Sequence, residues 1–514
     1  MKMALLVMTA LSLLLLVVVS PATASVSVSP AECSAADVLW LWSGALSSHS
    51  VSFRVGLREG HACGDRAFLL RVHPELHADE RPHSAIAMCH GTAEDTDADT
   101  EASSVKACDV LETLHAGRAY KYELSLIRDD TVVKSGGFRT PGEEGKPMSF
   151  RVAFSSCADE DSDPQVFKEI ASHDPLFFLH MGDLHYHNLA VNDVTQFRRA
   201  YYTMFASPAG RAMLEMDLPF AYMWDDHDYG PDNSDKTAPG RDAAVQVYRE
   251  FVPHYELQGQ AADGPRSAIY QAFSIGRVRF IVTDLRSERT PNLAPDVPSK
   301  TVLGAKQKKW FKQELVRATE DPGVALIVWV STMPWIDDER KWGYFQHEQQ
   351  ELVNYMKGQN LNKWVPIVIV SGDAHMLAVD DGSNSPGNLT TLHAAALGRP
   401  GSIKGGPYSH GLFPGSGQYG LLDITDDGKR ACIYYRGMNI YDGQLLEFDT
   451  CYPERTPAKE PYFPPPIPVR ILQRKWKKAK RYAGVAASVV ISVLGLGVGL
   501  WYMLHKKKDA KKQD

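Results

Sequence analysis

Four largely apolar runs along the chain stop abruptly at polar or acidic residues. The run at 220–224 stops at Asp-Asp-His-Asp, the run at 175–181 at Gly-Asp, the run at 365–370 at Ser-Gly-Asp, and the run at 148–154 at Ser-Ser-Cys. Continuous apolar runs of this length are typical of β-strands that are covered on both faces. In open α/β sheets, ligand-binding groups gather just beyond the carboxyl ends of such strands. The pattern therefore predicts a functional site at one sheet edge.

The residue types at these strand ends favour a metal cluster. Three carboxylates and an imidazole within 225–228 would repel each other if they were buried without a counter-charge. A bound cation relieves that repulsion, because carboxylates and neutral imidazole are also its natural ligands. For this stretch alone, the alternative is a solvated acidic turn. Because four strand ends share the feature, we expect one cluster that contains Cys157, Asp183, Tyr186, Asp226, His227, Asp373 and His375.

Two hydropathy patterns divide the middle of the chain. Apolar and polar residues alternate at 51–57, as in a half-buried strand, and similar short segments follow, so 25–141 is expected to form a small β-sandwich. Between 148 and 451, apolar strands alternate with helical patterns such as those at 165–170 and 194–204. This alternation favours an α/β layered domain.

The first 24 residues read as a secretory signal peptide. A charged start at Lys2 precedes an apolar core at 4–19, and the small residues Ala22 and Ala24 fit cleavage before Ser25. The alternative is a signal anchor that stays attached to the protein.

A second apolar run, at 483–504, is uncharged and long enough to cross a bilayer. With a cleaved signal peptide, it predicts a type I membrane protein at the cell surface or in the endoplasmic reticulum. A Pro-rich and then basic stalk at 452–482 and a basic cytoplasmic tail at 505–514 would flank the span. Gly495 and Gly499 form a small-xxx-small pair, a pattern that is typical of helix dimerisation.

Charge is distributed very unevenly along the chain. Residues 470–514 carry twelve Lys/Arg against two Asp, a net of +10, so the total of −7 leaves −17 for residues 1–469. Such an acidic major part argues against nucleic acid as a binding partner. A small phosphorylated substrate remains compatible, because a bound metal supplies local positive charge.

The cysteines indicate an oxidising compartment. Cys33, Cys63, Cys89 and Cys108 allow three pairings, and Cys432 can pair with Cys451. Cys157 is then left over beside the expected metal cluster. Asn388 begins an Asn-Leu-Thr glycosylation sequon, which places it on the surface if it is used.

In combination, the strand-end motifs resemble those of the PhoD-like metallophosphatases, the alkaline phosphatase D group. The resemblance runs from about residue 51 to residue 442. Its motifs are Ser156-Cys157, Gly182-Asp183-Leu184-His185-Tyr186, Trp224-Asp225-Asp226-His227-Asp228 with Asn233 after it, Asp284-Leu285-Arg286, and Ser371-Gly372-Asp373-Ala374-His375. Leu285 departs from the usual threonine, and the aromatic and acidic segment at 333–344 matches more loosely.

The resemblance implies a two-sheet, calcineurin-like α/β catalytic domain after a fibronectin-III-like β-sandwich. It implies Fe³⁺ held by Cys157, Asp183 and Tyr186, and one or two Ca²⁺ held by Asp225, Asp226, Asp228, Asn233 and Asp373, with other divalent metals as alternatives. Attack of a metal-bound oxygen on phosphorus would follow. Asp226, His227 and His375 would be catalytic, and Arg286 and His410 would bind substrate; which histidine protonates the leaving group stays open.

Taken singly, several of these residues have simpler interpretations. Cys157 would be a buried thiol, Tyr186 a core aromatic and His180 a core histidine, while His185 and His187 would be surface or supporting residues. Their joint occurrence in family order favours a phosphohydrolase that acts on small phosphomonoesters or diesters. The alternatives are a non-catalytic cell-surface binding protein on a phosphatase fold, and a phosphodiesterase specialised for lipid headgroups, which a membrane tether would favour.

Overall fold

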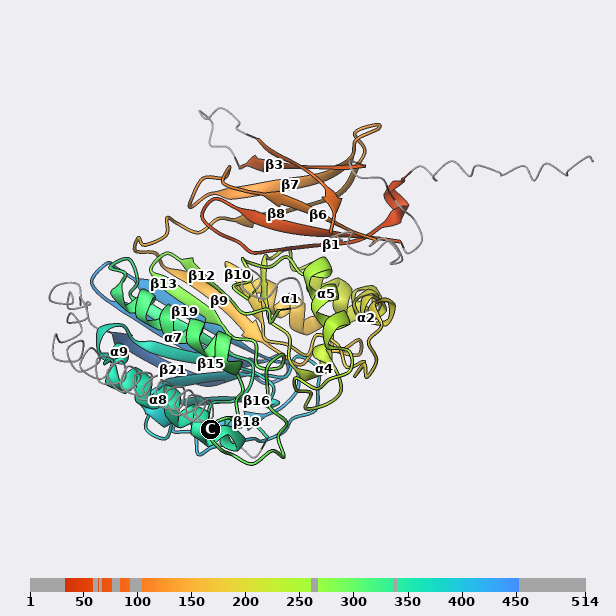
Figure 1. Cartoon of the computed structure of the whole chain (residues 1–514). Coiled ribbons are helices and arrows are strands. Elements are labelled where there is room, and N and C mark those ends of the chain that lie inside the picture. The colour runs from red at the N-terminus through yellow and green to blue at the C-terminus, as the bar shows by residue number, and fades with distance from the viewer. Residues whose placement is uncertain are drawn as a thin grey trace, which may run out of the picture.

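The computed structural model describes residues 33–58, 63, 67–75, 84–92, 104–259, 267–336 and 340–452. They form a mixed α/β structure with three sheets (Figure 1). The helices are α1 (Gln165–Ser172), α2 (Val194–Ala206), α3 (Pro208–Leu214), α4 (Asp226–Tyr229), α5 (Arg241–Phe251), α7 (Gly304–Glu320), α8 (Gln346–Gly358) and α9 (Leu361–Trp364), with 3-10 turns η1 (Ala35–Asp37), η2 (Trp342–Phe345) and η3 (Pro386–Asn388). The helical patterns at 165–170 and 194–204 therefore fall on α1 and α2.

The largest sheet has ten strands and runs through both the N-terminal part and the part from residue 148 onward, which is expected to be catalytic and is called the catalytic part below. Its order is β21 (Gly443–Tyr452), β20 (Ala431–Asn439), β19 (Gln418–Asp426), β9 (Phe150–Ser155), β10 (Phe177–His180), β11 (Phe220–Tyr222), β1 (Val38–Gly44), β2 (Val51–Leu57), β6 (Val105–Val110) and β5 (His90–Gly91). The two parts join where Gly44 of β1 pairs with Phe220 of β11 in parallel. One sheet of the N-terminal β-structure is thus continuous with the catalytic sheet.

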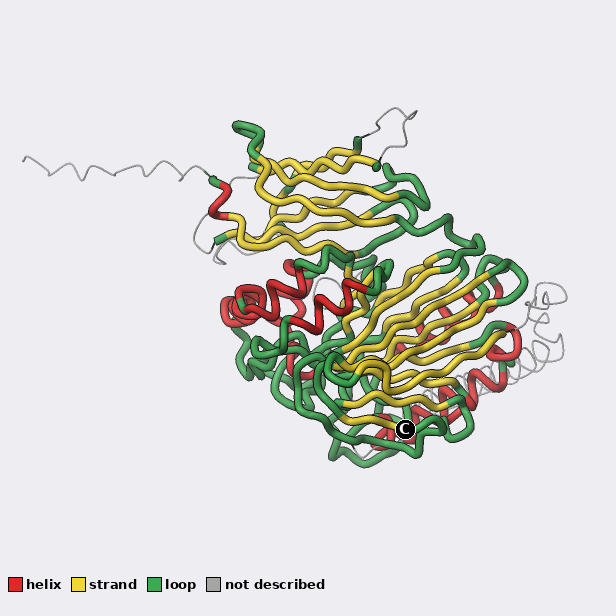
Figure 2. The backbone as a smooth tube through the Cα atoms, turned by 180° about the vertical axis from the view of Figure 1, so that it is seen from behind, coloured by secondary structure: helices red, strands yellow, loops and turns green. Residues whose placement is uncertain are grey.

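The other N-terminal sheet has four strands, and the second catalytic sheet has seven. The four-stranded order is β4 (Ala85–Met88), β3 (Phe68–Pro74), β7 (Ala119–Leu126) and β8 (Val132–Arg139). The seven-stranded order is β12 (Gln271–Ile275), β13 (Val278–Val282), β14 (Leu326–Ser331), β15 (Ile367–Ser371), β17 (Thr390–Ala394), β16 (Met376–Asp380) and β18 (Leu412–Pro414). Seen from behind, strands fill the interior and helices lie at the periphery (Figure 2).

The catalytic core lies between the two large sheets. The ring of Phe177 in β10 lies 5.9 Å from that of Phe273 in β12 and 5.6 Å from that of Phe280 in β13, centroid to centroid. On the outer face of the seven-stranded sheet, Phe311 of α7 packs against Trp329 of β14 at 4.7 Å. Every residue of β14 and β15 is buried, because helices and the facing sheet cover both sides.

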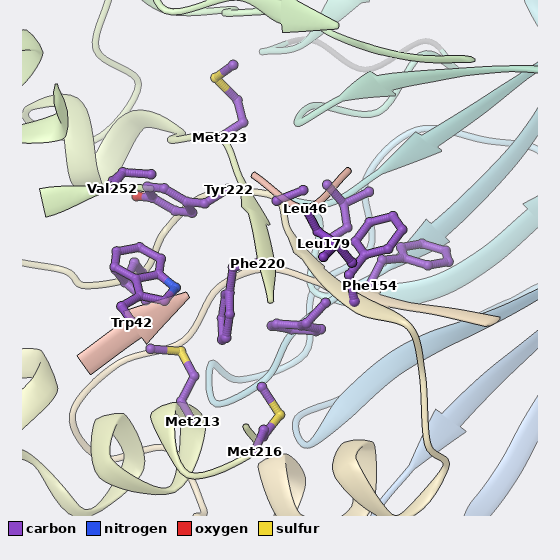
Figure 3. Packing of buried hydrophobic residues seen from close by; sticks show 14 of the residues in the cluster. Trp42, Leu46, Phe154, Leu179, Met213, Met216, Phe220, Tyr222, Met223 and Val252 are labelled. Carbon is purple, nitrogen blue, oxygen red and sulfur yellow. The ribbon is translucent and has the colours of Figure 1, made fainter. Parts of the chain in front are cut away.

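Aromatic packing holds the N-terminal strands to the catalytic part (Figure 3). Trp42 of β1 is 1% exposed and lies edge-on to Phe220 of β11 at 5.5 Å and to Phe205 of α2 at 5.3 Å. Nearby, Asp217 accepts hydrogen bonds from the Tyr122 hydroxyl at 2.8 Å and from the backbone N–H of Gly137 at 2.5 Å. The two parts therefore share a core, and we expect them to unfold together.

Trp42→Ala is expected to destabilise the whole protein by about 3–5 kcal/mol, because it removes a buried aromatic ring and leaves a cavity at this junction. Guanidinium unfolding curves measure the effect. Leu39→Ala is the control, since Leu39 lies on the same strand but is 46% exposed, and a cost within about 0.5 kcal/mol is expected there. Equal costs for the two variants would contradict a shared core around Trp42.

Three disulfides cross-link the described residues. Cys432 in β20 bonds Cys451 in β21, as predicted. Of the three pairings open to the N-terminal cysteines, the structure has Cys33–Cys63 and Cys89–Cys108. Cys157 is free and buried, which leaves its thiol for the site described below.

The predicted fold class and localisation need correction at the C-terminus. Among the described residues, no helix combines the length and apolar character needed to cross a bilayer. The predicted signal peptide at 1–24, the span at 483–504 and the tail at 505–514 lie outside the described residues, as does all of the stalk after residue 452. The described residues form a mixed α/β fold with large sheets, and they support neither the predicted transmembrane helix nor the type I topology. Membrane anchoring and dimerisation through such a helix have no support.

Candidate active site

The polar residues that follow the apolar strands meet where the two large sheets face each other. Strands β9, β10 and β11 are neighbours and parallel, and β15 lies in the other sheet, parallel to β14. Carboxylate oxygens of Asp183, Asp225, Asp226 and Asp373 all lie within 4.8 Å of one another. Across the sheets, the backbone N–H of Asp373 donates to Ser156 Oγ at 3.0 Å. The predicted convergence of separate strand ends is therefore observed.

Three of the converging residues have a left-handed backbone. The φ angles are 62° at Cys157, 54° at Asp183 and 66° at Asp373. Non-glycine residues adopt this region rarely, at a cost on the order of 1–3 kcal/mol each. Each occurs just after a buried strand, where the unusual turn directs the side chain into the site instead of along the strand. Such strain is a common property of functional sites.

One end of the cluster combines a thiol, a phenol and a carboxylate. Asp183 Oδ2 accepts a hydrogen bond from the Tyr186 hydroxyl at 3.1 Å and lies 3.5 Å from Cys157 Sγ. Burial and the neighbouring carboxylates of Asp183 and Asp373 raise the pKa of the Cys157 thiol well above its usual range. Burial and Asp183 likewise raise the pKa of the Tyr186 phenol. These groups become anions together only when a cation lies among them.

The other end of the cluster consists of carboxylates that face a buried arginine. Arg286 Nε donates to Asp225 Oδ1 at 2.5 Å, and its second terminal nitrogen lies 3.3 Å from Asp226 Oδ1. Asp226 Oδ2 accepts from the backbone N–H of Asn233 at 2.6 Å. Burial would raise the pKa of Asp226, but the Arg286 guanidinium holds it below its usual range. Arg286, which was predicted to bind substrate, is completely buried and forms ion pairs with Asp225 and Asp226.

These residues fit a metal centre. Among the described residues, nothing donates a hydrogen bond to Asp225 Oδ2, although this oxygen is buried. Burial and the carboxylates of Asp226 and Asp225 raise the pKa of Asp183. The raised pKa reflects both the cost of burying the charge and the electrostatic repulsion between these carboxylates. A buried, unpaired carboxylate oxygen inside a crowded anionic cluster is costly unless a cation binds it. Oxygen, sulfur and imidazole donors at this spacing suit such a cation.

Asp228, which was predicted to bind a metal, accepts backbone hydrogen bonds through both of its carboxylate oxygens. Its Oδ1 accepts from the backbone N–H groups of Leu184 and His185 at 2.6 and 3.3 Å, and its Oδ2 from those of Asp183 and Asp225 at 2.5 and 3.0 Å. Burial raises the pKa of Asp228 to about 7 despite these four donors. With both oxygens used, Asp228 ties the two ligand-bearing loops together and does not join the group of converging oxygens.

The predicted histidines fall into different environments. A ring nitrogen of His227 belongs with Asp183 and Asp226 to a second group of converging donors, and its Nδ1 contacts Asn188 Oδ1 at 2.6 Å. His375 Nδ1 contacts the Pro400 carbonyl at 2.6 Å, so this nitrogen carries the proton. Burial lowers the pKa of His375. Of these two histidines, His227 is the one that shares a group of converging donors with the aspartates.

Other predicted positions lie apart from the cluster. His410 contacts Asp381 at 3.8 Å and the Phe448 ring at 4.9 Å, which gives it no direct link to the converging donors. His185, expected at the surface or in support, is fully buried, as is His180, and burial lowers the pKa of each to about 3. Asn388 is exposed at the end of η3, and a glycan there has no support beyond its sequon.

Two lysines at the site were not predicted from the sequence. The ammonium of Lys341 forms an ion pair with Asp373 Oδ2, and that of Lys404 lies 3.9 Å from the same oxygen. Burial would raise the pKa of Asp373, but Lys341 and Lys404 hold it well below its usual range. Both lysines lie in loops without a periodic pattern. For Lys341, a signal in the sequence was the aromatic segment Trp342-Gly343-Tyr344, which it immediately precedes.

Comparison with known proteins agrees with this geometry. A family model described as PhoD-like phosphatase matches residues 152–396. The solved structure of a PhoD protein superimposes with a TM-score of 0.62 at 18% identity, covering 81% of this chain and 90% of that one. A purple acid phosphatase, PPD1 from yellow lupin (Lupinus luteus) seeds, gives a TM-score of 0.52 at 14% identity, covering 80% and 73%.

At these identities the two structures support the fold alone, and no curated protein sequence matches the chain. The family match covers all the strand ends that converge on the acidic cluster, from β9 to β17. Because the family model and the buried donor set coincide, residues 152–396 form a PhoD-like phosphatase domain, and the chain is a phosphoric ester hydrolase.

Proposed function

We propose that this chain hydrolyses small organic phosphomonoesters and phosphodiesters at the cluster between the two large sheets. The observation that carries the proposal is the convergence of Asp183, Asp225, Asp226 and Asp373 within 4.8 Å, beside a thiol and a phenol. Carboxylates packed this closely bind cations, and cations in turn attract the charged oxygens of a phosphate ester.

The two ends of the cluster favour different metals. Thiolate and phenolate donors stabilise ferric iron, so Cys157, Asp183 and Tyr186 would hold Fe³⁺. The oxygens of Asp225, Asp226 and Asp373 would suit Ca²⁺, with other divalent ions as substitutes. When bound, such ions polarise the phosphoryl group, activate the attacking nucleophile and neutralise the charge that develops during transfer.

The chain's own residues would orient the ester and move its proton. His227, close to Asp183 and Asp226, is better placed than His375 to protonate the departing alkoxide, because burial lowers the pKa of His375 and favours its neutral form. The Lys404 side chain is 15% exposed, and its ammonium would contact a non-bridging phosphate oxygen at the mouth of the site.

Assays with p-nitrophenyl phosphate and bis-p-nitrophenyl phosphate test this proposal. We expect hydrolysis of at least one ester, and we expect a calcium chelator to lower the rate by at least about tenfold, because removing a cation exposes the carboxylates to the substrate's negative charge. Adding Ca²⁺ back should restore the rate, which separates metal loss from unfolding. Turnover of neither ester would support the non-catalytic binding protein. A membrane tether would favour the lipid-headgroup alternative, and no described helix could supply that tether.

A further inference from the structure

Lys341 places a positive charge inside the carboxylate end of the cluster. Its side chain is 1% exposed, and its ammonium forms an ion pair with Asp373 Oδ2. Asp373 is itself one of the four aspartates whose oxygens converge. A buried ammonium is costly to desolvate unless it is closely paired, and here the cluster supplies its partner. Lys341 is therefore a component of the cluster and not a surface residue beside it.

The backbone around Lys341 is anchored in the core. Trp342, the next residue and the first of η2, is fully buried, and its indole Nε1 donates to Ser331 Oγ at the end of β14 at 3.2 Å. Its ring packs against those of Trp335 at 4.9 Å and Trp329 at 5.9 Å. These packed tryptophans fix the position of the backbone next to Lys341. The fold therefore holds the lysine side chain close to Asp373.

The two ends of the cluster are neutralised differently. At the carboxylate end, Arg286 pairs with Asp225 and Asp226, and Lys341 pairs with Asp373. At the thiol end, the nearby Arg399 lies over the Tyr186 ring at 4.2 Å but forms its ion pair with Asp159. Protein cations thus compensate the carboxylate end, where each one competes with a metal ion for the same oxygens.

We infer that the Lys341 ammonium takes the place of one Ca²⁺, so that the protein holds one calcium ion in addition to iron, and not two. The inference rests on the proposed metal set and decides the number of ions that this set contains. Asp225 Oδ2, which has no hydrogen-bond donor among the described residues, together with oxygens of Asp183 and Asp226, would hold the single calcium ion. Asp373, counted above among the oxygens that suit Ca²⁺, would then pair with Lys341 instead of binding the metal.

Metal analysis of the full chain tests the inference. The protein is equilibrated with Ca²⁺, freed of unbound ions, and analysed by inductively coupled plasma mass spectrometry. We expect one iron and one calcium per wild-type chain, and a gain of one calcium in Lys341→Met, which frees Asp373. Lys341→Arg keeps the charge and is expected to keep one calcium. Lys404→Met is the matched control, because its ammonium is 3.9 Å from the same oxygen and partly exposed, and one calcium is expected there too.

Two calcium ions in the wild-type chain would overturn the inference without any variant, so it is testable even if Lys341→Met fails to fold. An unchanged calcium count in a folded Lys341→Met protein would overturn it as well. The count is independent of turnover. A protein with the expected counts but no esterase activity would refute the proposed function and leave the role of Lys341 standing, while an active protein with two calcium ions would do the reverse.

Discussion

Asp183→Asn is expected to lower kcat/KM for p-nitrophenyl phosphate by about 10³-fold or more, because it removes the charge that links the two ends of the cluster. Asp183 Oδ2 contacts both Cys157 and Tyr186, while Oδ1 accepts from the His227 backbone at 3.2 Å. Asparagine keeps the size of the side chain and one acceptor oxygen, but it supplies no negative charge to a metal. Iron content and any thiolate- or phenolate-to-iron colour should fall together with the rate.

The stability of the same variant separates loss of chemistry from loss of fold. Burial and the carboxylates of Asp226 and Asp225 raise the pKa of Asp183, so its charge is unfavourable without a metal. Metal-free Asp183→Asn should therefore unfold at the same temperature as the metal-free wild type, or at a higher one. Asp161→Asn, at an exposed carboxylate, should leave the rate unchanged. Near-normal turnover in Asp183→Asn would contradict the assignment of the site.

Gly182→Ala is expected to cost about 2–4 kcal/mol of stability and to lower turnover by about 10²-fold or more, because it forces two ligand-bearing loops apart. Gly182 has a φ of +88°, and a Cβ there would lie 2.3 Å from the backbone nitrogen of Asp225 and 2.7 Å from the carbonyl carbon of Trp224. Backbone atoms cannot rotate away as a side chain can. Denaturant unfolding and the esterase assay measure the two effects.

Gly411→Ala provides a control with the same backbone geometry. Gly411 also has a φ of +88°, but a Cβ there would meet nothing within 4 Å. Gly411→Ala should lower the free energy of unfolding by only about 1 kcal/mol, which is the cost of placing a side chain in the left-handed region. The difference between the two alanine variants isolates the close approach of the loops. Similar losses in both would mean that backbone conformation, and not contact with Asp225, accounts for the effect.

The apolar runs and their endings were predictable because both are local properties of the chain. A run such as 365–370 can be buried only as a covered strand, and the acidic residue after it must then lie at a sheet edge. The membrane topology was inferred from equally local patterns at 4–19 and 483–504, but these lie outside the described residues, and no described helix can cross a bilayer. The disulfide pairing of the four N-terminal cysteines could not be predicted, because the spacing of cysteines along the chain does not determine which strands are neighbours.

By itself, the sequence determined which residues end the buried strands and which donor types they carry. Hydrophobic periodicity and side-chain chemistry can be recognised in one segment without knowing which other segments it packs against. Only the tertiary structure decided that Asp226 joins the cluster while Asp228, two residues later in α4, binds four backbone N–H groups. It also decided that Lys341 neutralises Asp373. These outcomes depend on distances between segments far apart in the chain, and packing of the two sheets sets those distances.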